Sequence, residues 1–192
     1  KKIKTENYAV FIDSNVAFHP DYLYHQAIPP VNASNYFNTL ELFFDKFQKN
    51  TGLKIKFAAS PKTDIQILKK YLPKRKFFYN QTLNIVKNSK LVLMHASTSI
   101  FFPLKFGKPT LFLTSNDLKN TWFGYQIAHF AKLFNKETIN MDSVFNHSNR
   151  YLYKKLNKKT VQNYMKTHDK LPNTHDNLIW KTFTKYIIGK KI

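Results

Sequence analysis

The feature that most constrains this chain is a short apolar run, Leu91–Met94, with polar residues on both sides. A continuous apolar run of this length is typical of a strand covered on both faces, as in a parallel sheet. His95–Ser99 follows with small polar side chains where a helix would begin, and Gly107 and Pro109 mark its end. Leu111–Leu113 then predicts a second parallel strand. The stretch therefore predicts a strand–helix–strand unit.

The rest of the chain repeats this alternation of strands and helices. Further strands are predicted at Tyr8–Ile12, Leu53–Ala59, Arg75–Tyr79 and Thr138–Met141. Helices are predicted over residues 34–50, 64–71, 82–88 and 121–134, the second capped by Thr63 or Asp64 and the third by Thr82. Residues 16–33 form a long loop, which usually marks a functional segment or a lid. The pattern predicts a Rossmann-like α/β fold, with a parallel sheet of about six strands and helices on both faces.

The C-terminal part, residues 143–192, is rich in Lys, Asn and His and has a weaker periodicity. Helices are expected near 158–167 and 176–188, the second with Leu178, Ile179, Phe183 and Ile187 facing inward. We find no internal repeat or linker and predict one domain, 1–192, with 143–192 as a closing helical tail. The abrupt basic start without Met suggests a fragment of a longer chain.

The charge balance is strongly basic, with 31 Lys and Arg against 11 Asp and Glu and a formal net charge of +20. Arginine occurs only at Arg75 and Arg150, although base readout and phosphate forks favour arginine. The charge therefore indicates anionic substrates or an anionic membrane surface rather than specific nucleic acid. A lysine-rich solvated surface is the alternative.

Composition also narrows the chemistry. The absence of cysteine excludes disulfides and thiol catalysis and fits a cytoplasmic location, with peripheral binding to the inner membrane face as an option. No apolar run approaches the ~20 residues that cross a bilayer. No Walker A, GxGxxG or GxSxG motif is present, which argues against ATPase, dinucleotide oxidoreductase and α/β-hydrolase activities. No metal-ligand cluster is apparent, and no metal or cofactor is expected.

Four predicted strands end in clustered polar residues: Asp13–Asn15, Ser60–Lys62, His95–Ser99 and Thr114–Ser115. The carboxyl ends of parallel strands share one edge, where ligands bind in open α/β sheets. A helix that begins near Thr98 would add unpaired N–H groups and a positive dipole end. These features predict a pocket for a nucleotide phosphate.

Two segments carry a family resemblance: Leu83–Ser99, and Phe106–Thr110 with its Gly-Lys-Pro. They resemble the C-terminal half of GT-B glycosyltransferases, most closely the bacterial enzymes of capsule or lipopolysaccharide synthesis. Phe11-Ile-Asp and Phe18-His-Pro-Asp are also similar, so the resemblance covers roughly residues 7–142. It implies a bound nucleotide-sugar donor, a glycan or lipid-linked acceptor, and no metal.

Some bacterial sialyltransferases of this type carry a His-Pro motif that contacts cytidine monophosphate and a Ser-Ser/Thr motif at the phosphate. Ser97-Thr98-Ser99 matches the second motif, whereas Ser60-Pro61 has serine where histidine is expected. A cytidine-monophosphate-activated sugar is therefore one candidate donor. His19-Pro20 lies in the loop after the first strand and is not assigned this role.

Each candidate residue has a functional and a structural interpretation. Asp13 is a candidate base or sugar ligand, although the base of GT-B enzymes usually comes from the N-terminal domain. The candidate donor-binding residues are His95, Ser97, Thr98, Ser99, Ser60, Lys62, Thr114 and Ser115. Their alternatives are a core histidine, helix caps and a surface lysine. His19 and Asp21 lie in the long loop, where they either face the interdomain cleft or serve as turn residues, and the turn is the preferred interpretation.

The functional prediction is the donor-binding domain of a glycosyltransferase of bacterial surface-polysaccharide synthesis. One alternative is a non-catalytic nucleotide-sugar-binding or membrane-docking module, which Ser60 favours. A GT-B-fold epimerase or polyol-phosphate transferase shares the fold. A nucleic-acid binder is suggested only by the charge. The oligomeric state, the sugar and the linkage stay open.

Overall fold

A computed structural model describes residues 5–168 and 179–188. The chain divides into two compact units, Lys1–Val161 and Gln162–Ile192, which are considered separately. The first unit contains a six-stranded, all-parallel sheet of order β3-β2-β1-β4-β5-β6. Its strands are β1 (Tyr8–Ile12), β2 (Lys54–Ala59), β3 (Phe77–Tyr79), β4 (Leu91–Met94), β5 (Thr110–Thr114) and β6 (Thr138–Asn140). This confirms the predicted Rossmann-like α/β fold.

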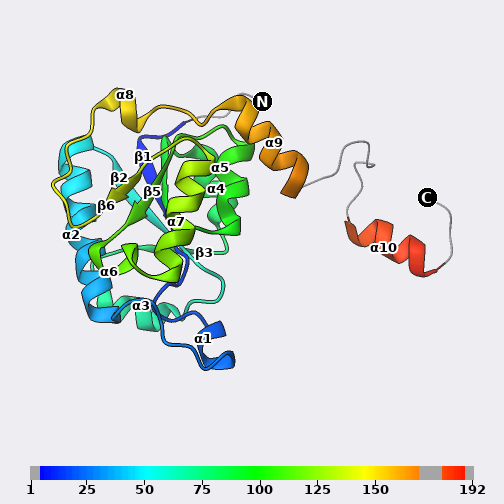
Figure 1. Cartoon of the computed structure of the whole chain (residues 1–192), viewed down its shortest axis with the longest axis horizontal. Coiled ribbons are helices and arrows are strands. Elements are labelled where there is room, and N and C mark those ends of the chain that lie inside the picture. The colour runs from blue at the N-terminus through cyan, green and yellow to red at the C-terminus, as the bar shows by residue number, and fades with distance from the viewer. Residues whose placement is uncertain (1–4, 169–178, 189–192) are drawn as a thin grey trace. The chain divides into compact units, whose positions relative to one another are not determined.

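Helices connect the strands and flank the sheet, and further helices follow the last strand. They are α1 (Asp21–Tyr24), α2 (Ala33–Thr51), α3 (Ile65–Tyr71), α4 (Thr82–Asn88), α5 (Phe101–Lys105), α6 (Asn116–Lys119), α7 (Trp122–Leu133), α8 (Asn149–Leu152) and α9 (Lys158–His168). A 3-10 turn, η1 (Thr98–Ile100), leads into α5. In Figure 1, α2 lies on one side of the sheet, and α4, α5 and α7 lie on the other. Parallel strands require such crossovers, which are almost always right-handed.

The core lies on both faces of the sheet, between the central strands and α2 on one side and α4, α5 and α7 on the other. Every residue of β1, β4 and β5 is buried, which is why these strands are apolar without alternation. Helix α2 buries one face, formed by Tyr36, Phe37, Leu40, Phe43, Phe44 and Phe47. The Phe11 ring of β1 packs against Phe44 at 5.2 Å and Phe57 at 5.1 Å between ring centroids. Asn32 caps α2, and Gly52 ends it with φ 69°.

Some element boundaries differ from the prediction. Strand β3 begins at Phe77 rather than Arg75. The Arg75 side chain pairs with Glu41 at 2.8 Å and Asp45 at 2.6 Å on α2. The predicted long loop contains the short helix α1, and α6 is an additional helix that the sequence pattern does not predict. Thr82 is the first residue of α4 rather than its cap, because Gln81 occupies that position without a side-chain bond.

The second unit contains the helix α10 (Ile179–Ile187). This confirms the predicted second helix of the tail; Phe183 and Ile187 are 52% and 65% exposed in the described part of this unit, and the expectation that they face inward stays a prediction. The apolar period predicts the helix, but no local pattern identifies the surface that would cover it. Leu178 and the Ile179 side chain lie outside the described residues. Within residues 5–168 and 179–188, no helix is long and apolar enough to cross a membrane.

Candidate functional site

A cavity of about 430 Å³ lies at the carboxyl ends of the three adjacent strands β2, β1 and β4. We call it the strand-end cavity. Asp13 and Ser14 after β1, Ser60–Lys62 after β2 and Ala96–Ser99 after β4 line it. The chain runs outward from β1 to β2 and β3 and then returns to β4 on the other side of β1. The cavity therefore lies at the topological switch point, where open α/β sheets bind ligands.

Asp13 forms part of the cavity wall but is only 6% exposed. Its Oδ1 accepts a hydrogen bond from the Asn15 backbone N–H at 2.8 Å. Its Oδ2 accepts bonds from the Thr63 hydroxyl at 2.9 Å and the Ser60 backbone N–H at 3.3 Å. Burial raises the Asp13 pKa, and these three donors act against the rise. Through these bonds, Asp13 connects the loop after β1 to the loop after β2.

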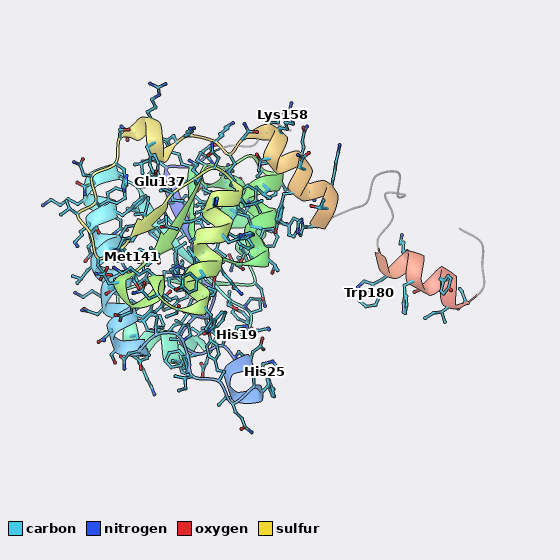
Figure 2. All side chains as sticks on the ribbon, viewed as in Figure 1. His19, His25, Glu137, Met141, Lys158 and Trp180 are labelled. Carbon is cyan, nitrogen blue, oxygen red and sulfur yellow. The ribbon has the colours of Figure 1, made fainter. Side chains whose placement is uncertain are left out.

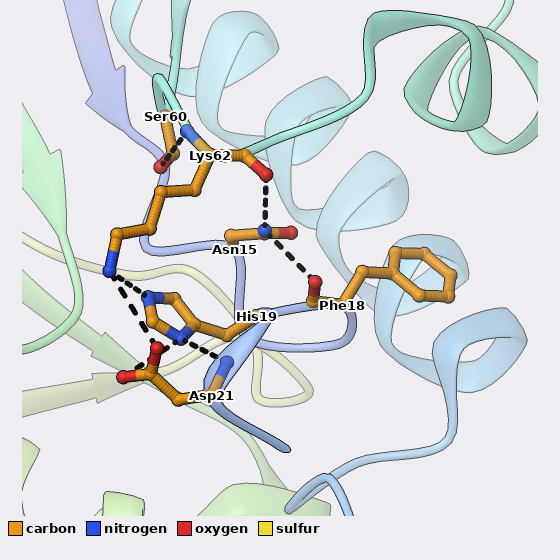
Figure 3. A network of polar contacts seen from close by, with 6 residues as sticks. All are labelled: Asn15, Phe18, His19, Asp21, Ser60 and Lys62. Carbon is orange, nitrogen blue, oxygen red and sulfur yellow. Dashed lines mark hydrogen bonds and ion pairs between the residues drawn. The ribbon is translucent and has the colours of Figure 1, made fainter. Parts of the chain in front are cut away.

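His19, Asp21 and Lys62 form a polar network at the rim of the cavity (Figure 3). The Lys62 ammonium lies 3.3 Å from His19 Nε2 and 3.8 Å from an Asp21 carboxylate oxygen. His19 Nδ1 lies 3.4 Å from the other Asp21 oxygen. The Asp21 backbone N–H also donates to His19 Nδ1 at 3.3 Å, so the imidazole links Lys62 to the start of α1. Lys62 and Asp21 are more than half exposed, so their pairing is weak and the ammonium can turn toward a bound anion.

The loops that carry this network are tied together by Asn15. Its side-chain amide donates to the carbonyl oxygens of Phe18 at 3.1 Å and Lys62 at 3.3 Å (Figure 3). Asn15 adopts φ 51°, a left-handed conformation that asparagine tolerates better than most residues. Figure 2 shows His19 close to the body of the domain and His25 farther along the chain, just after α1. The turn after β1 therefore brings His19 to the cavity.

Ser97, Thr98 and Ser99 line the cavity where β4 passes into η1. The Ser97 hydroxyl oxygen accepts from the Ser99 backbone N–H at 3.2 Å, while Thr98 is exposed. The Ser14 hydroxyl donates to the Ala96 carbonyl oxygen at 3.4 Å, which links this turn to the end of β1. The predicted helix start at Thr98 is confirmed, although its first turn is 3-10 rather than α.

His95 lies in the core and does not line the strand-end cavity. It is fully buried, its Nδ1–H donates to the Leu113 carbonyl oxygen at 2.7 Å, and the Tyr36 hydroxyl donates to its Nε2 at 2.9 Å. Burial lowers the His95 pKa to about 4. A buried side chain in this position does not reach a phosphate bound in the strand-end cavity. His95 is therefore a core histidine, which was the structural alternative. Its ring points between α2 and β5 because both polar partners lie there.

Thr114 and Ser115 also lie apart from the cavity. Strand β4 separates β5 from β1, so the end of β5 does not reach the switch point. The Ser115 hydroxyl oxygen instead accepts from the Leu118 backbone N–H at 3.1 Å and caps α6, and Thr114 is buried. These two residues therefore do not line the strand-end cavity, their predicted contact with the donor stays a prediction, and Ser115 acts as the helix cap that was the alternative.

Several residues that line the cavity were not predicted from the sequence to be part of the site. For His19 and Asp21 the sequence favours a turn over a position facing a cleft, yet both line the cavity. The sequence assigns no role to Tyr22, Trp122 and Gln126, which also line it. Burial, followed by the charge of Asp21, raises the Tyr22 pKa to about 12, so its hydroxyl stays protonated at neutral pH. The position of His19, Asp21 and Tyr22 in the loop after β1 could have identified them from the sequence. Loops at the carboxyl ends of parallel strands lie at the edge of the sheet where ligands bind.

The described residues contain no group of three or more His, Cys, Asp or Glu side chains arranged to hold a metal ion. Comparisons with protein families, with curated proteins and with solved structures yield no match to this chain. The cavity itself is therefore the main indication of function.

Proposed function

We propose that this chain is the donor nucleotide-sugar-binding domain of a glycosyltransferase of bacterial surface-polysaccharide synthesis. The observation that carries the proposal is the joining of two features in one cavity at the switch point. The hydroxyls of Ser97–Ser99 form one wall, and the His19–Lys62 pair lies at the rim. Hydroxyl donors and a mobile cation suit a phosphate without a glycine-rich loop.

The reaction that such a site would support is glycosyl transfer. An acceptor hydroxyl oxygen bonds to the anomeric carbon, the bond from that carbon to the phosphate oxygen breaks, and the phosphate keeps the electron pair. Lys62 and the Ser97–Ser99 turn would stabilise the charge that grows on the leaving phosphate. The proton of the acceptor must pass to a base. Because three hydrogen bonds already engage Asp13, we assign that base to another part of the enzyme.

The alternative of a non-catalytic module is favoured by Ser60, which stands where the resemblance implies histidine. The cavity nevertheless contains an imidazole, because His19 reaches it from the loop after β1. His19 lies 3.3 Å from Lys62, which is two residues after Ser60. The serine at position 60 is therefore a weaker reason to assign a non-catalytic role.

A thermal-shift panel tests the donor site. We expect one nucleotide among CMP, UDP, GDP and their sugars to raise the melting temperature of the wild type by several degrees, since binding to the folded state alone stabilises it. The Thr98→Ala/Ser99→Ala double variant should lose most of this shift, and Lys62→Met should reduce it. Calorimetry should show roughly tenfold weaker binding for the double variant, because it loses charge-assisted hydrogen bonds.

Two matched controls lie outside the cavity. Ser143→Ala/Thr160→Ala removes the same number of hydroxyls, and Lys87→Met removes one exposed ammonium. Both should respond to the nucleotide as the wild type does. A panel without any shift, or equal shifts in the Thr98/Ser99 variant, rules out the proposed phosphate site. Nucleotide binding without donor hydrolysis or transfer by the full-length protein would favour the non-catalytic module.

We also propose that the protein associates with an anionic membrane surface, where a lipid-linked acceptor would be found. The net charge of +20 supports this, and α10 exposes Trp180, Phe183 and Tyr186 beside Lys181. Aromatic side chains together with lysines suit a bilayer interface. We expect cosedimentation with phosphatidylglycerol vesicles but not with phosphatidylcholine vesicles. The Trp180→Ala/Phe183→Ala double variant should bind phosphatidylglycerol vesicles severalfold more weakly. The control Leu83→Ala, which removes an exposed apolar side chain elsewhere, should bind them as the wild type does. Equal binding of the wild type to both lipids would contradict the proposal.

A further inference from the structure

A second cavity, of about 490 Å³, continues from the strand-end cavity along α7. The two cavities share Ala96, Ser97, Thr98, Trp122 and Gln126. The second one extends past Tyr125 to His129 and Phe130, and we call it the α7 groove. A ligand that lies in the groove would therefore end beside the Ser97–Thr98 turn.

Aromatic side chains line the groove along one face of α7. Trp122, Tyr125 and His129 recur at i, i+3 and i+7, a spacing that covers about 10 Å along a helix. Trp122 is 52% exposed and Tyr125 is 66% exposed, although such large rings are usually mostly buried. An exposed row of rings next to a cavity is typical of a binding surface.

The Trp122 ring is held in place from the side. Tyr22 approaches it edge to face at 6.5 Å between centroids, and Phe123 does so at 5.5 Å. Phe123 in turn packs against the buried His95 ring at 6.1 Å. The indole is thus ordered before a ligand arrives, which reduces the entropy lost on binding.

The chemistry of the lining favours a neutral carbohydrate. Among the described residues that line the α7 groove there is no Lys, Arg, Asp or Glu. The polar groups are the hydroxyls of Ser97 and Thr98, the Gln126 amide and the His129 imidazole. The weakly positive C–H face of a pyranose packs on the negative face of an aromatic ring, and its hydroxyls bond to amides and hydroxyls. Single-stranded nucleic acid would instead require cations along its phosphates.

We propose that the α7 groove binds the acceptor as a neutral oligosaccharide chain, with sugar rings stacked on Trp122 and Tyr125. The proposal rests on the proposed glycosyltransferase function and adds to it the place and chemical class of the acceptor. Charge is segregated between the two cavities: the cation of Lys62 lies at the strand-end cavity, and the groove is neutral. The shared Ser97–Thr98 wall would bring the end of the acceptor beside the donor.

Titration of the protein with neutral tetrasaccharides of glucose, galactose, N-acetylglucosamine and N-acetylgalactosamine tests the groove. Calorimetry of the wild type should detect saturable binding of at least one of them. Tyr125→Ala should weaken it roughly fivefold and Trp122→Ala by more, because stacking contacts are lost. Tyr125→Phe should retain the wild-type affinity, since the ring remains.

The matched controls are Tyr24→Ala and Trp180→Ala, which remove exposed rings outside the groove and should leave the affinity unchanged. Absence of binding to all four sugars, or equal affinity in Tyr125→Ala, overturns the proposal. So does binding of a uridine oligonucleotide at physiological salt that depends on Tyr125, because this would identify a nucleic-acid surface.

The groove and the donor site can fail separately. Tyr125 lines only the groove, so Tyr125→Ala should show the wild-type thermal shift with nucleotide. Tetrasaccharide binding without any thermal shift by a nucleotide would support the oligosaccharide site in the groove and contradict the proposed donor site. A thermal shift by a nucleotide without tetrasaccharide binding would support the donor site and contradict the oligosaccharide site.

Discussion

Replacing Gly124 by alanine is expected to destabilise the first unit by about 3 kcal/mol, the upper end of the usual range for overpacking. A Cβ at this position would overlap the carbonyl group of Leu118 and the backbone of Lys119. Both belong to α6, which packs directly against the first turn of α7. Backbone atoms cannot move aside as a flexible side chain can. The gain of about 1 kcal/mol in helix propensity is too small to compensate.

Gly107→Ala is the matched control for this substitution. Gly107 has φ 58°, and a Cβ added at that position would meet no neighbouring atom within 4 Å. Its replacement should therefore lose only about 1 kcal/mol, from the left-handed backbone conformation. Urea unfolding followed by circular dichroism measures both free energies of unfolding. If Gly124→Ala is as stable as the wild type or as Gly107→Ala, the backbone of α6 does not lie as close to Gly124 as the structure shows.

The stability of the protein should fall as the pH is lowered from 6.5 to 4, by up to about 3 kcal/mol from His95 alone. Burial lowers the folded-state pKa of His95 to about 4 from an ordinary value of 6.5. Between these values the unfolded chain binds a proton that the folded protein does not. The contribution is therefore fully present above pH 6.5 and is lost as the pH falls toward 4.

His95→Gln isolates this contribution, because glutamine does not titrate. The variant should be less stable than the wild type at pH 7 by about 1–3 kcal/mol, since the bonds to Tyr36 and Leu113 are disturbed. Its free energy of unfolding should depend less on pH between 6.5 and 4. Asp13, whose pKa is raised by burial, contributes the opposite slope in acid, but it does so in both proteins. The difference between the two profiles therefore reports His95.

The exposed His25 provides the control, and His25→Gln should keep the wild-type pH profile. Urea unfolding at several pH values between 4 and 7 gives the three profiles. An unchanged slope in His95→Gln would contradict the burial of a neutral imidazole between α2 and β5.

Local sequence patterns determined the secondary structure and the edge of the sheet that carries the site. The apolar period of residues 36–47 predicts the buried face of α2, because that period follows from helix geometry alone. The unbroken run Leu91–Met94 predicts a strand covered on both faces. The polar residues after β1, β2 and β4 do converge in one cavity, since parallel strands all end at the same edge.

Tertiary packing alone decided which polar residues reach that cavity. His95 and Ser97 are two residues apart, yet His95 turns into the core toward Tyr36, 59 residues away, and Ser97 lines the cavity. Strand order excluded Ser115, and the turn held by Asn15 brought in His19. The rings of Trp122 and Tyr125 fit the period of α7, but only its packing left them exposed. A sequence pattern encodes which side chains share a face, whereas long-range contacts decide what that face meets.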